Sequence, residues 1–277
     1  MKTLKRILAA TTLLVTLGFA SEANAQVPLE NFFKNPEKAG YQISPDGKYF
    51  SYMAPYENRL NLFVQEVGSD KATRITSETV RDLAGSMWAN GHRILYIKDT
   101  AGDENFQLYG VNVDGTDSKA YTAFPKVRTT IIDPLENIDS LVIIGLNKRN
   151  PQVFDPYRLN LNNGELTQLA ENPGNIQGWM TDHNGKLRVA LAIVDGVNTQ
   201  ILYRETEEQP FRPVLTTNFK ETVSFATFTP DNKMVYALHS IFTGLCDIPT
   251  ADTCCIASGV RCSSLNLSTS LPLFTPQ

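Results

Sequence analysis

Residues 85–124 read GSMWANGHRILYIKDTAGDENFQLYGVNVDGTDSKAYTAF, four short apolar segments separated by three turns. The segments are SMWA, RILYIKDT, FQLYGVNV and KAYTAF, and the turns are NG, GDEN and DGTD. Asn-Gly and Asp-Gly favour tight hairpins because both tolerate positive φ, and the flanking segments alternate or run apolar as strands do. The stretch therefore predicts four consecutive antiparallel strands.

The same kind of turn recurs along the chain at a regular interval. It appears as SPDGKYFSYM at 44–53, ANGHRILYI at 89–97, DHNGKLRVAL at 182–191 and TPDNKMVYAL at 229–238. The turn residues Asp46, Asn90, Asn184 and Asp231 are 44, 94 and 47 positions apart, and the long middle gap contains a looser turn within 135–146. A second set of turns, at 67–71, 113–117, 161–165 and 205–209, falls between the first. The chain thus repeats a unit of about 46 residues with two hairpins in each.

Four-stranded units repeating every 40 to 50 residues are typical of β-propeller blades. We therefore predict an all-β fold, a partial β-propeller of about four four-stranded blades plus the start of a fifth. The predicted blades cover 40–84, 85–129, 130–175 and 176–222, and the fifth begins at 223–238. A β-sandwich with fortuitous turn spacing is the competing interpretation.

In such blades the loops between second and third strands emerge on one face. These loops, at 54–61, 99–106, 146–154 and 194–200, are predicted to be long and rich in charge. We expect their charged residues to share a rim around the central channel and to be the first place to look for contacts with a ligand. The rim residues are Glu57, Arg59, Asp103, Glu104, Lys148, Arg149 and Asp195.

Each charged pair on this rim has two interpretations. Asp103 and Glu104 have the charge to bind an ammonium group or a metal ion, and a solvated loop is the simpler alternative. Lys148 and Arg149 have the charge to recognise a carboxylate, with Arg149 in bidentate fashion, or to form an exposed turn before Pro151. Arg59, beside Asn58, has the same two readings.

Motifs for catalysis are missing from the sequence. G-x-S-x-G, which carries the nucleophile of α/β-hydrolases, does not occur, and neither does HExxH or a Gly-rich phosphate loop. His92 and His183 sit beside hairpin turns, and no two of the three histidines have metal-ligand spacing. We predict no catalytic, cofactor-binding or metal-binding residues, no cofactor, and no enzymatic activity for this chain by itself.

The N-terminus reads as an export signal. MKTLKR is basic, ILAATTLLVTLGFA is apolar but shorter than a membrane span, and SEANA ends in an Ala-x-Ala pattern, so cleavage is expected after Ala25. The remaining chain has 22 basic and 28 acidic residues, which argues against nucleic acid or an anionic membrane as a partner. We predict a periplasmic or secreted protein with a signal peptide at 1–25 and no membrane attachment after cleavage.

Several ordered motifs carry a family resemblance. ISPDGKYFSYMAPYENRLNLFVQ, ITSETVRDLAG, ILYIKDTAGDENFQLYGVNVDG, IIGLNKRNPQVFDPYRLN and TDHNGKLRVALA together resemble the N-terminal propeller of exported bacterial serine peptidases of the prolyl oligopeptidase family, near the acylaminoacyl and dipeptidyl peptidases. The resemblance covers residues 27 to 238. It implies a two-domain enzyme in which the propeller limits access to, and helps bind peptides for, an α/β-hydrolase domain. No residue of this chain matches the catalytic motif of that domain.

The pattern changes after residue 238. Residues 239–277 contain three charged residues and eleven serines and threonines, and all four cysteines, Cys246, Cys254, Cys255 and Cys262, lie there. A zinc site fits this spacing poorly, and a disulfide clip is an alternative since the count is even. We favour a shifted reading frame or a spliced fragment, because composition, turn spacing and blade period change together. The predicted domains are an incomplete propeller at 26–238 and an atypical tail at 239–277, either frameshifted or disordered.

These features lead to one functional hypothesis and one rival. The chain is predicted to be the non-catalytic, substrate-gating and peptide-binding propeller of a secreted serine peptidase, truncated before the catalytic domain. Its partners would be the peptide substrates of the complete enzyme and its own missing hydrolase domain. The rival is a free-standing periplasmic propeller that binds proteins or peptides as a scaffold.

Overall fold

The computed structural model describes residues 27–33, 37–240, 253–257 and 260–266. The chain divides into two compact units, residues 1–37 and 38–277. In the first unit the described residues form one short helix, α2 (Leu29–Phe33). The predicted signal peptide, residues 1–25, and its cleavage site lie outside the described residues. Among the described residues, no helix is long and apolar enough to cross a membrane.

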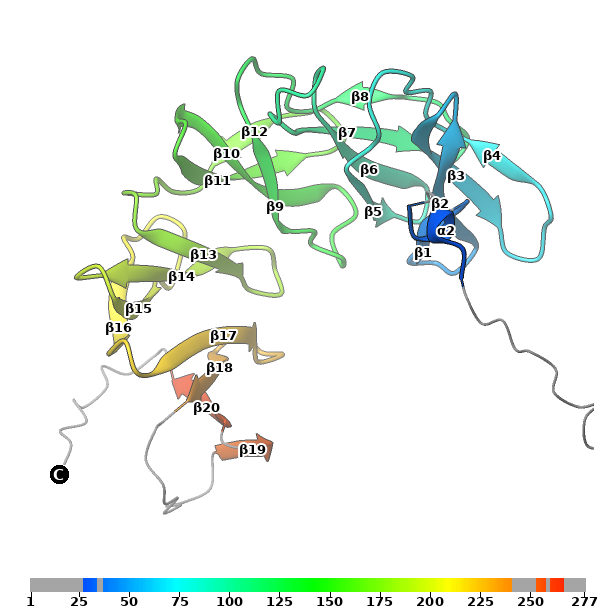
Figure 1. Cartoon of the computed structure of the whole chain (residues 1–277). Coiled ribbons are helices and arrows are strands. Elements are labelled where there is room, and N and C mark those ends of the chain that lie inside the picture. Colours follow the sequence, from blue (N-terminus) through cyan, green and yellow to red (C-terminus); the bar gives the residue numbers. More distant parts are fainter. Residues whose placement is uncertain (1–26, 34–36, 241–252, 258–259, 267–277) are drawn as a thin grey trace, which may run out of the picture. The chain divides into compact units, whose positions relative to one another are not determined.

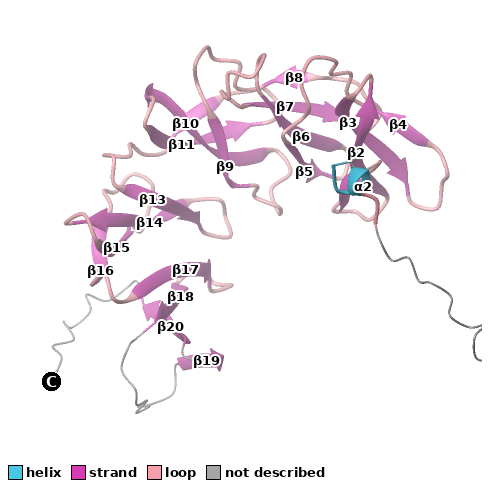
Figure 2. Ribbon diagram, in the orientation of Figure 1, coloured by secondary structure: helices cyan, strands magenta, loops and turns pink. Residues whose placement is uncertain are grey.

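The described residues of the second unit form five four-stranded antiparallel sheets (Figures 1 and 2), which we call blades 1 to 5. Blade 1 contains β1 (Ala39–Ile43), β2 (Tyr49–Tyr56), β3 (Arg59–Glu66) and β4 (Ala72–Arg74). Blade 2 contains β5 (Gly85–Asn90), β6 (Arg93–Lys98), β7 (Gln107–Asn112) and β8 (Lys119–Ala120). Blade 3 contains β9 (Thr129–Asp133), β10 (Leu141–Asn150), β11 (Val153–Asn160) and β12 (Leu166–Gln168). Blade 4 contains β13 (Ile176–Thr181), β14 (Leu187–Val194), β15 (Asn198–Tyr203) and β16 (Arg212–Thr217). The predicted all-β fold of four-stranded blades is confirmed.

Blade 5 has a different strand order. Blades 1 to 4 are meanders in which each strand pairs with the next, whereas blade 5 has the order β17-β18-β20-β19. Its strands are β17 (Thr222–Phe228), β18 (Met234–Ser240), β19 (Thr253–Ala257) and β20 (Val260–Asn266). Two of them therefore lie in the segment predicted to be an atypical tail, and their backbone ladder places Cys254 opposite Cys262. Cys246 lies outside the described residues.

The predicted hairpin turns are built by side chains that accept hydrogen bonds from the turn backbone. In blade 1, Asp46 accepts hydrogen bonds from Ser44 Oγ (2.7 Å) and from the Lys48 N–H (3.2 Å), and Gly47 has a φ of +71°. Thr229 and Asp231 repeat this arrangement in blade 5, with an Oγ1–Oδ1 distance of 2.6 Å. A short polar side chain and a residue with positive φ are what such a turn requires.

Neighbouring blades share their hydrophobic cores, which explains the continuous apolar runs of the second strands. On β6, Ile94 and Tyr96 pack with Leu62 of blade 1, while Leu95 packs with Val142 of blade 3. Alternate side chains of a strand point to opposite faces, so a strand buried on both faces is apolar over most of its length. The same holds on β10 and β14, whose residues pack against the blades on either side.

Close packing also fixes residue size at the start of blade 3. Gly145 on β10 pairs with Thr130 on β9, and a Cβ atom added at Gly145 would lie 2.6 Å from the Thr130 Oγ1 atom. That distance is shorter than any normal contact, so a larger residue at Gly145 would require the Thr130 side chain to shift.

Hydrogen bonds join each blade to the next. Gln42 of blade 1 donates to the Ser86 carbonyl (2.8 Å), and Asn90 of blade 2 donates to the Asp139 carbonyl (3.0 Å). Tyr121 of blade 2 donates to the Leu161 carbonyl of blade 3 at 2.7 Å. These bonds link residues 44, 49 and 40 positions apart, close to the repeat seen in the sequence.

Candidate functional site

The predicted rim residues lie at or beside the connections between second and third strands, a side of the blades that we call the rim end. Three of the four connections are shorter than predicted. Glu57 and Asn58 form a two-residue turn with φ values of +48° and +62°, Pro151 and Gln152 connect β10 to β11, and residues 195–197 connect β14 to β15. The prediction of long loops is therefore wrong in blades 1, 3 and 4. It holds in blade 2, where residues 99–106 connect β6 to β7.

Asp103 and Glu104 lie in the longer connection of blade 2. The Asp103 carboxylate accepts hydrogen bonds from the Asn105 side chain (3.1 Å) and from the N–H groups of Asn105 (3.1 Å) and Thr100 (3.2 Å). These bonds, chiefly the one from the Asn105 side chain, lower the pKa of Asp103. Below the loop, buried Asp99 pairs with Arg81 at 3.3 Å and accepts a hydrogen bond from the Glu104 N–H. Asp103 thus shapes its own loop.

Lys148 and Arg149 lie within β10 and not in a loop, because the strand extends to Asn150. The Arg149 guanidinium donates to both carboxylate oxygens of Asp155, at 2.8 and 2.9 Å. Asp155 is fully buried, and its hydrogen bond to Arg149 raises the pKa of that guanidinium. Lys148 places its ammonium 4.5 Å from the centroid of the Phe124 ring. The bidentate geometry expected of Arg149 is therefore present, but its carboxylate belongs to the protein itself.

Asn172 extends the Arg149–Asp155 pair into the connection between blades 3 and 4. Its N–H donates to Asp155 (2.7 Å), its carbonyl accepts from Arg149 (2.8 Å), and its side chain bonds the N–H and the carbonyl of Ile176. The residue is buried. Sequence reasoning missed Asn172, although the Asn-Pro-Gly run at 172–174 is a strong turn signal that marks the place.

A groove lies directly beside this network, at the rim end of blades 3 and 4. Its volume is about 450 Å³, and it is lined by residues 130–132 of β9, by residues 152–154, by Asn172 and Gly174 of the connection, and by residues 176–179 of β13. Figure 1 shows β9 and β13 as the first strands of neighbouring sheets. The lining residues include Gln152, Asn172, Gln177, Phe154 and Trp179, and none carries a charge.

A second cavity lies toward the other ends of β9 and β13. It has a volume of about 330 Å³, and its walls come from residues 133–138, 180–183 and 226–227. Asp133, Glu136 and Asp182 give it an acidic character that the groove lacks, and His183 lies in the same wall. Within the part of the chain that the structure describes, no group of three or more His, Cys, Asp or Glu side chains is arranged to hold a metal ion.

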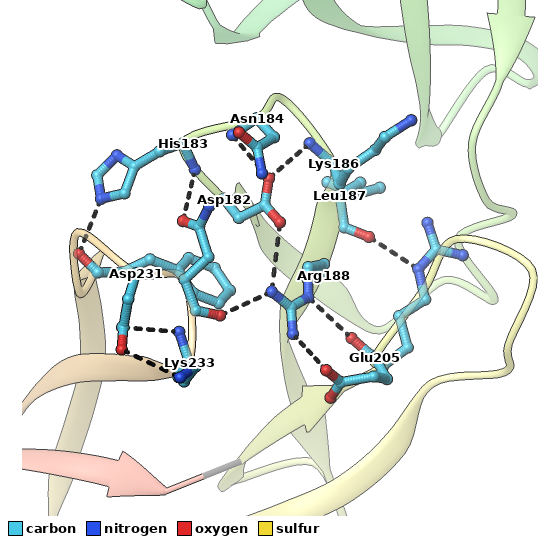
Figure 3. Close-up of polar contacts among 12 residues, drawn as sticks. Asp182, His183, Asn184, Lys186, Leu187, Arg188, Glu205, Asp231 and Lys233 are labelled. Carbon is cyan, nitrogen blue, oxygen red and sulfur yellow. Dashed lines mark hydrogen bonds and ion pairs between the residues drawn. The ribbon is translucent and has the colours of Figure 1, made fainter. Parts of the chain in front are cut away.

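Buried Arg188 forms the centre of the polar contacts around this second cavity (Figure 3). Its guanidinium lies 3.3 Å from Asp182 and 3.3 Å from Glu205, and it donates to the Asn232 carbonyl of blade 5 at 2.9 Å. It also donates to the Tyr203 hydroxyl. The cluster joins blade 4 to blade 5.

His183 lies at the edge of the same cluster. Its Nε2 is 3.0 Å from the Phe228 carbonyl, and its N–H donates to the Asn232 side chain at 3.0 Å. Both contacts cross to blade 5. His92, in the corresponding turn of blade 2, donates its N–H to the Asn90 side chain at 3.1 Å. The contacts of both histidines are those of turn residues, as their positions in the sequence indicate.

The rim residues do not converge on a single point. Among the interactions of the described residues, none joins rim residues from two different blades. The side chains of Glu57, Arg59 and Asp195 have no hydrogen bond or ion pair with other residues of the described ranges. Arg149, of the predicted set, instead joins Asp155 and Asn172 in the network beside the blade 3–4 groove.

Repeated four-stranded antiparallel sheets with shared cores place the chain in the class of β-propeller proteins. Two solved structures agree in fold alone: oligopeptidase B from Leishmania major, with a TM-score of 0.51 over 73% of this chain and 30% of that one, and an oligogalacturonate lyase in complex with manganese, with a TM-score of 0.53 over 86% and 68%. Their sequence identities to this chain are 10% and 11%.

Sequence comparison is more specific. The chain is 31% identical over 195 residues to dipeptidyl aminopeptidase BIII of Pseudoxanthomonas mexicana and 28% identical over 200 residues to dipeptidyl peptidase family member 6 of Caenorhabditis elegans. These alignments cover 67% and 69% of this chain but only 28% and 26% of the relatives, so the chain spans about a quarter of their length. No family model matches the chain. The chain is thus homologous to a region of these peptidases, which confirms the resemblance to the propeller of the prolyl oligopeptidase family.

Proposed function

We propose that this chain is the propeller portion of an exported serine peptidase of the prolyl oligopeptidase family, in which it controls access of peptides and helps to bind them. The observation that carries the proposal is the similarity over 195 residues to a dipeptidyl aminopeptidase, in a chain built of propeller blades. The uncharged groove between blades 3 and 4 supports it, because its mixture of amide and apolar side chains suits a peptide.

We place the hydrolytic step outside this chain. Nucleophilic catalysis in α/β-hydrolases needs a serine on a strained turn with a histidine and an acid nearby, and G-x-S-x-G does not occur in these 277 residues. The activity of this chain by itself is therefore binding and not bond cleavage. The sequence of the first 25 residues supports export to the periplasm, with Gln26 as the first residue of the mature protein.

Calorimetric titration of the full chain with unblocked tetrapeptides and hexapeptides tests the binding role. Saturable binding of the peptides, and no binding of an oligogalacturonate as a control ligand, is the expected result. The absence of binding to any peptide, with the β-sheet circular dichroism signal intact, would overturn the proposal.

Treatment with a fluorophosphonate probe tests the second part. The chain should remain unlabelled, while dipeptidyl aminopeptidase BIII, the positive control, should be labelled. Labelling of this chain on a serine would mean that it is a hydrolase in its own right.

A further inference from the structure

We propose that the groove between β9 and β13 binds an uncharged, extended stretch of peptide main chain that pairs with the exposed strand edges and places one apolar side chain against Phe154 and Trp179. This inference rests on the proposed function for the class of ligand. The inference goes beyond the proposed function because it assigns where the peptide binds, how its main chain pairs and that the bound segment is neutral.

Both walls of the groove are edge strands. β9 is the last strand in the order β12-β11-β10-β9, and β13 is the first in the order β13-β14-β15-β16, so each pairs on one side only. The outward N–H and C=O groups of an edge strand are a template for an added extended chain. The Thr129 N–H donates to the Phe106 carbonyl outside the sheet. Among the described residues, no such backbone hydrogen bond outside the sheets involves residues 130–132 or 177–179.

Each wall also contains an irregularity at the groove. The β13–β14 register shifts between Ile176 and Gly178, which leaves Gln177 as the extra residue. The β9–β10 register shifts between the pairs of Ile131 and Asp133, which leaves Ile132 as the extra residue. A bulge takes one residue out of the ladder and turns its backbone groups and side chain to a new direction, a device that is common beside binding sites. Gln177 and Ile132 both line the groove.

The polar side chains of the lining select against charge. Thr130, Gln152, Asn172 and Gln177 supply neutral donors and acceptors, and no lining residue is a carboxylate, an ammonium or a guanidinium. Arg149 and Asp155, which lie beside the groove, are paired with each other at 2.8 and 2.9 Å. A charged ligand group would therefore lose water without gaining a counter-charge, whereas a peptide amide would find partners of both kinds.

Apolar surface completes the groove. Val153, Phe154, Ile176 and Trp179 contribute to the lining, and Trp179 also packs against Phe211 with ring centroids 5.7 Å apart. Trp179 is thus held in place by the fold before a ligand arrives, and a rigid aromatic wall binds an apolar side chain at low entropic cost.

A capped peptide provides the probe. An N-acetylated, C-amidated hexapeptide with a central phenylalanine has no charge, and its analogue with N-methylated central amides keeps the side chains but lacks the main-chain donors. The full-length Trp88→Phe variant leaves Trp179 as its tryptophan fluorophore, since the chain has two tryptophans. We expect the capped peptide to change Trp179 fluorescence saturably and the N-methylated analogue to bind at least about tenfold more weakly.

Two variants locate the binding. Gln152→Asp combined with Gln177→Asp places charge on two exposed groove residues and should weaken calorimetric binding of the capped peptide at least about tenfold. Gln168→Asp, at an exposed position of β12 on the outer side of the same blade, is the matched control and should bind as the unaltered chain does.

The outcomes separate this inference from the proposed function. Peptide binding that is unaffected by the double variant, or that is lost on capping the termini, leaves the binding role intact and overturns the groove assignment. No calorimetric binding of any peptide, free or capped, overturns both. Binding that the double variant and N-methylation each weaken, with the Gln168→Asp variant unchanged, supports both.

Discussion

At the residue scale, the contacts of buried Arg188 show how burial determines how much an ion pair contributes to stability. Its two acidic partners are at the same distance, 3.3 Å, but the Asp182 side chain is 5% exposed and the Glu205 side chain is 60% exposed. Asp182 also accepts hydrogen bonds from the N–H groups of Asn184 and Lys186, both at 3.0 Å. The two acids therefore form a natural pair of test and control.

We predict that Asp182→Asn lowers the free energy of unfolding by about 3 kcal/mol, because it removes the buried counter-charge of Arg188 and leaves the largely exposed Glu205 as its acidic partner among the described residues. Glu205→Gln should lower it by less than about 1 kcal/mol, because water already screens that carboxylate. Urea unfolding of the two variants measures both values. Equal effects would mean that burial does not control the strength of these pairs.

Tyr203, which contacts the same arginine, makes the stability of the fold depend on pH. Burial, followed by the hydrogen bond to the Glu205 carboxylate, raises the pKa of Tyr203 from 10.0 to about 12. Above pH 10 the unfolded chain loses this proton while the folded chain keeps it, so stability falls as pH rises from about 10 to about 12. We predict that Tyr203→Phe removes this part of the alkaline loss. The test compares the unfolding free energies of the unaltered chain and the variant below and above pH 10. The ultraviolet signal of tyrosinate reports when tyrosine side chains lose their protons.

At the scale of elements, the link between blades 3 and 4 depends on a pair of charges from two blades. Arg158 on β11 donates to Glu207 at 2.7 Å and to the Gly185 carbonyl at 2.8 Å, and both charged side chains are largely buried. Burial opposes ionisation of Glu207, but the hydrogen bonds from Arg158 and from the Leu187 N–H outweigh it and lower the pKa below 4.5. The ionised form therefore contributes to holding the two blades together.

We predict that this contribution is present above pH 4.5 and is lost as pH falls through the lowered pKa of Glu207 in the folded chain. Glu207→Gln should remove it, so that the variant and the unaltered chain converge in stability toward low pH. Unfolding free energies measured as a function of pH test this. Since the two residues act as one pair, Arg158→Gln combined with Glu207→Gln should cost less than the sum of the single variants, and strict additivity would contradict the assignment.

At the scale of the whole molecule, β1 leaves two large apolar side chains of blade 1 exposed, at the border of an aromatic cluster. Ser51 and Met53 of β2 pair with Val64 and Leu62, on the side toward blade 2, so Phe50 and Tyr52 point to the opposite side. There an aromatic ladder runs through Tyr41, Phe50, Tyr52 and Phe63, with centroid distances of 5.2 to 6.1 Å. Tyr41 is 57% exposed and Ile43 is 71% exposed.

Contiguous exposed apolar surface drives association. We therefore predict that the chain self-associates with rising concentration and that Tyr41→Lys combined with Ile43→Lys reduces this. Val197→Lys, which alters an exposed valine in the β14–β15 turn, is the control and should leave association unchanged. Sedimentation velocity over a range of concentrations is the measurement. A monodisperse monomer at every concentration would contradict the prediction.

The sequence predicted the blades better than the groove, and the reason is physical. Turns such as Ser44–Lys48 are local, since a few neighbouring residues supply both the φ values and the hydrogen bonds, so their spacing reveals the repeat directly. The groove depends on Asp155 accepting bonds from Arg149 and from Asn172, which is 17 positions further along the chain. Nothing local indicates that Arg149 points at a buried acid and not at solvent. The exchange of strand order in blade 5 is likewise a choice of pairing partner that local preference does not determine.

The contacts between blades have one more consequence. The hydrogen bonds from Gln42 to Ser86, from Asn90 to Asp139, from Tyr121 to Leu161 and from Arg188 to Asn232 each reach one blade along the chain, with separations of 44, 49, 40 and 44 residues. Such a chain is coupled in one dimension, because each unit draws stability from its own strands and from the units beside it. Folding can then start at any adjacent pair of blades and spread outward, and a lesion in one blade weakens its immediate neighbours while more distant blades feel it only through them.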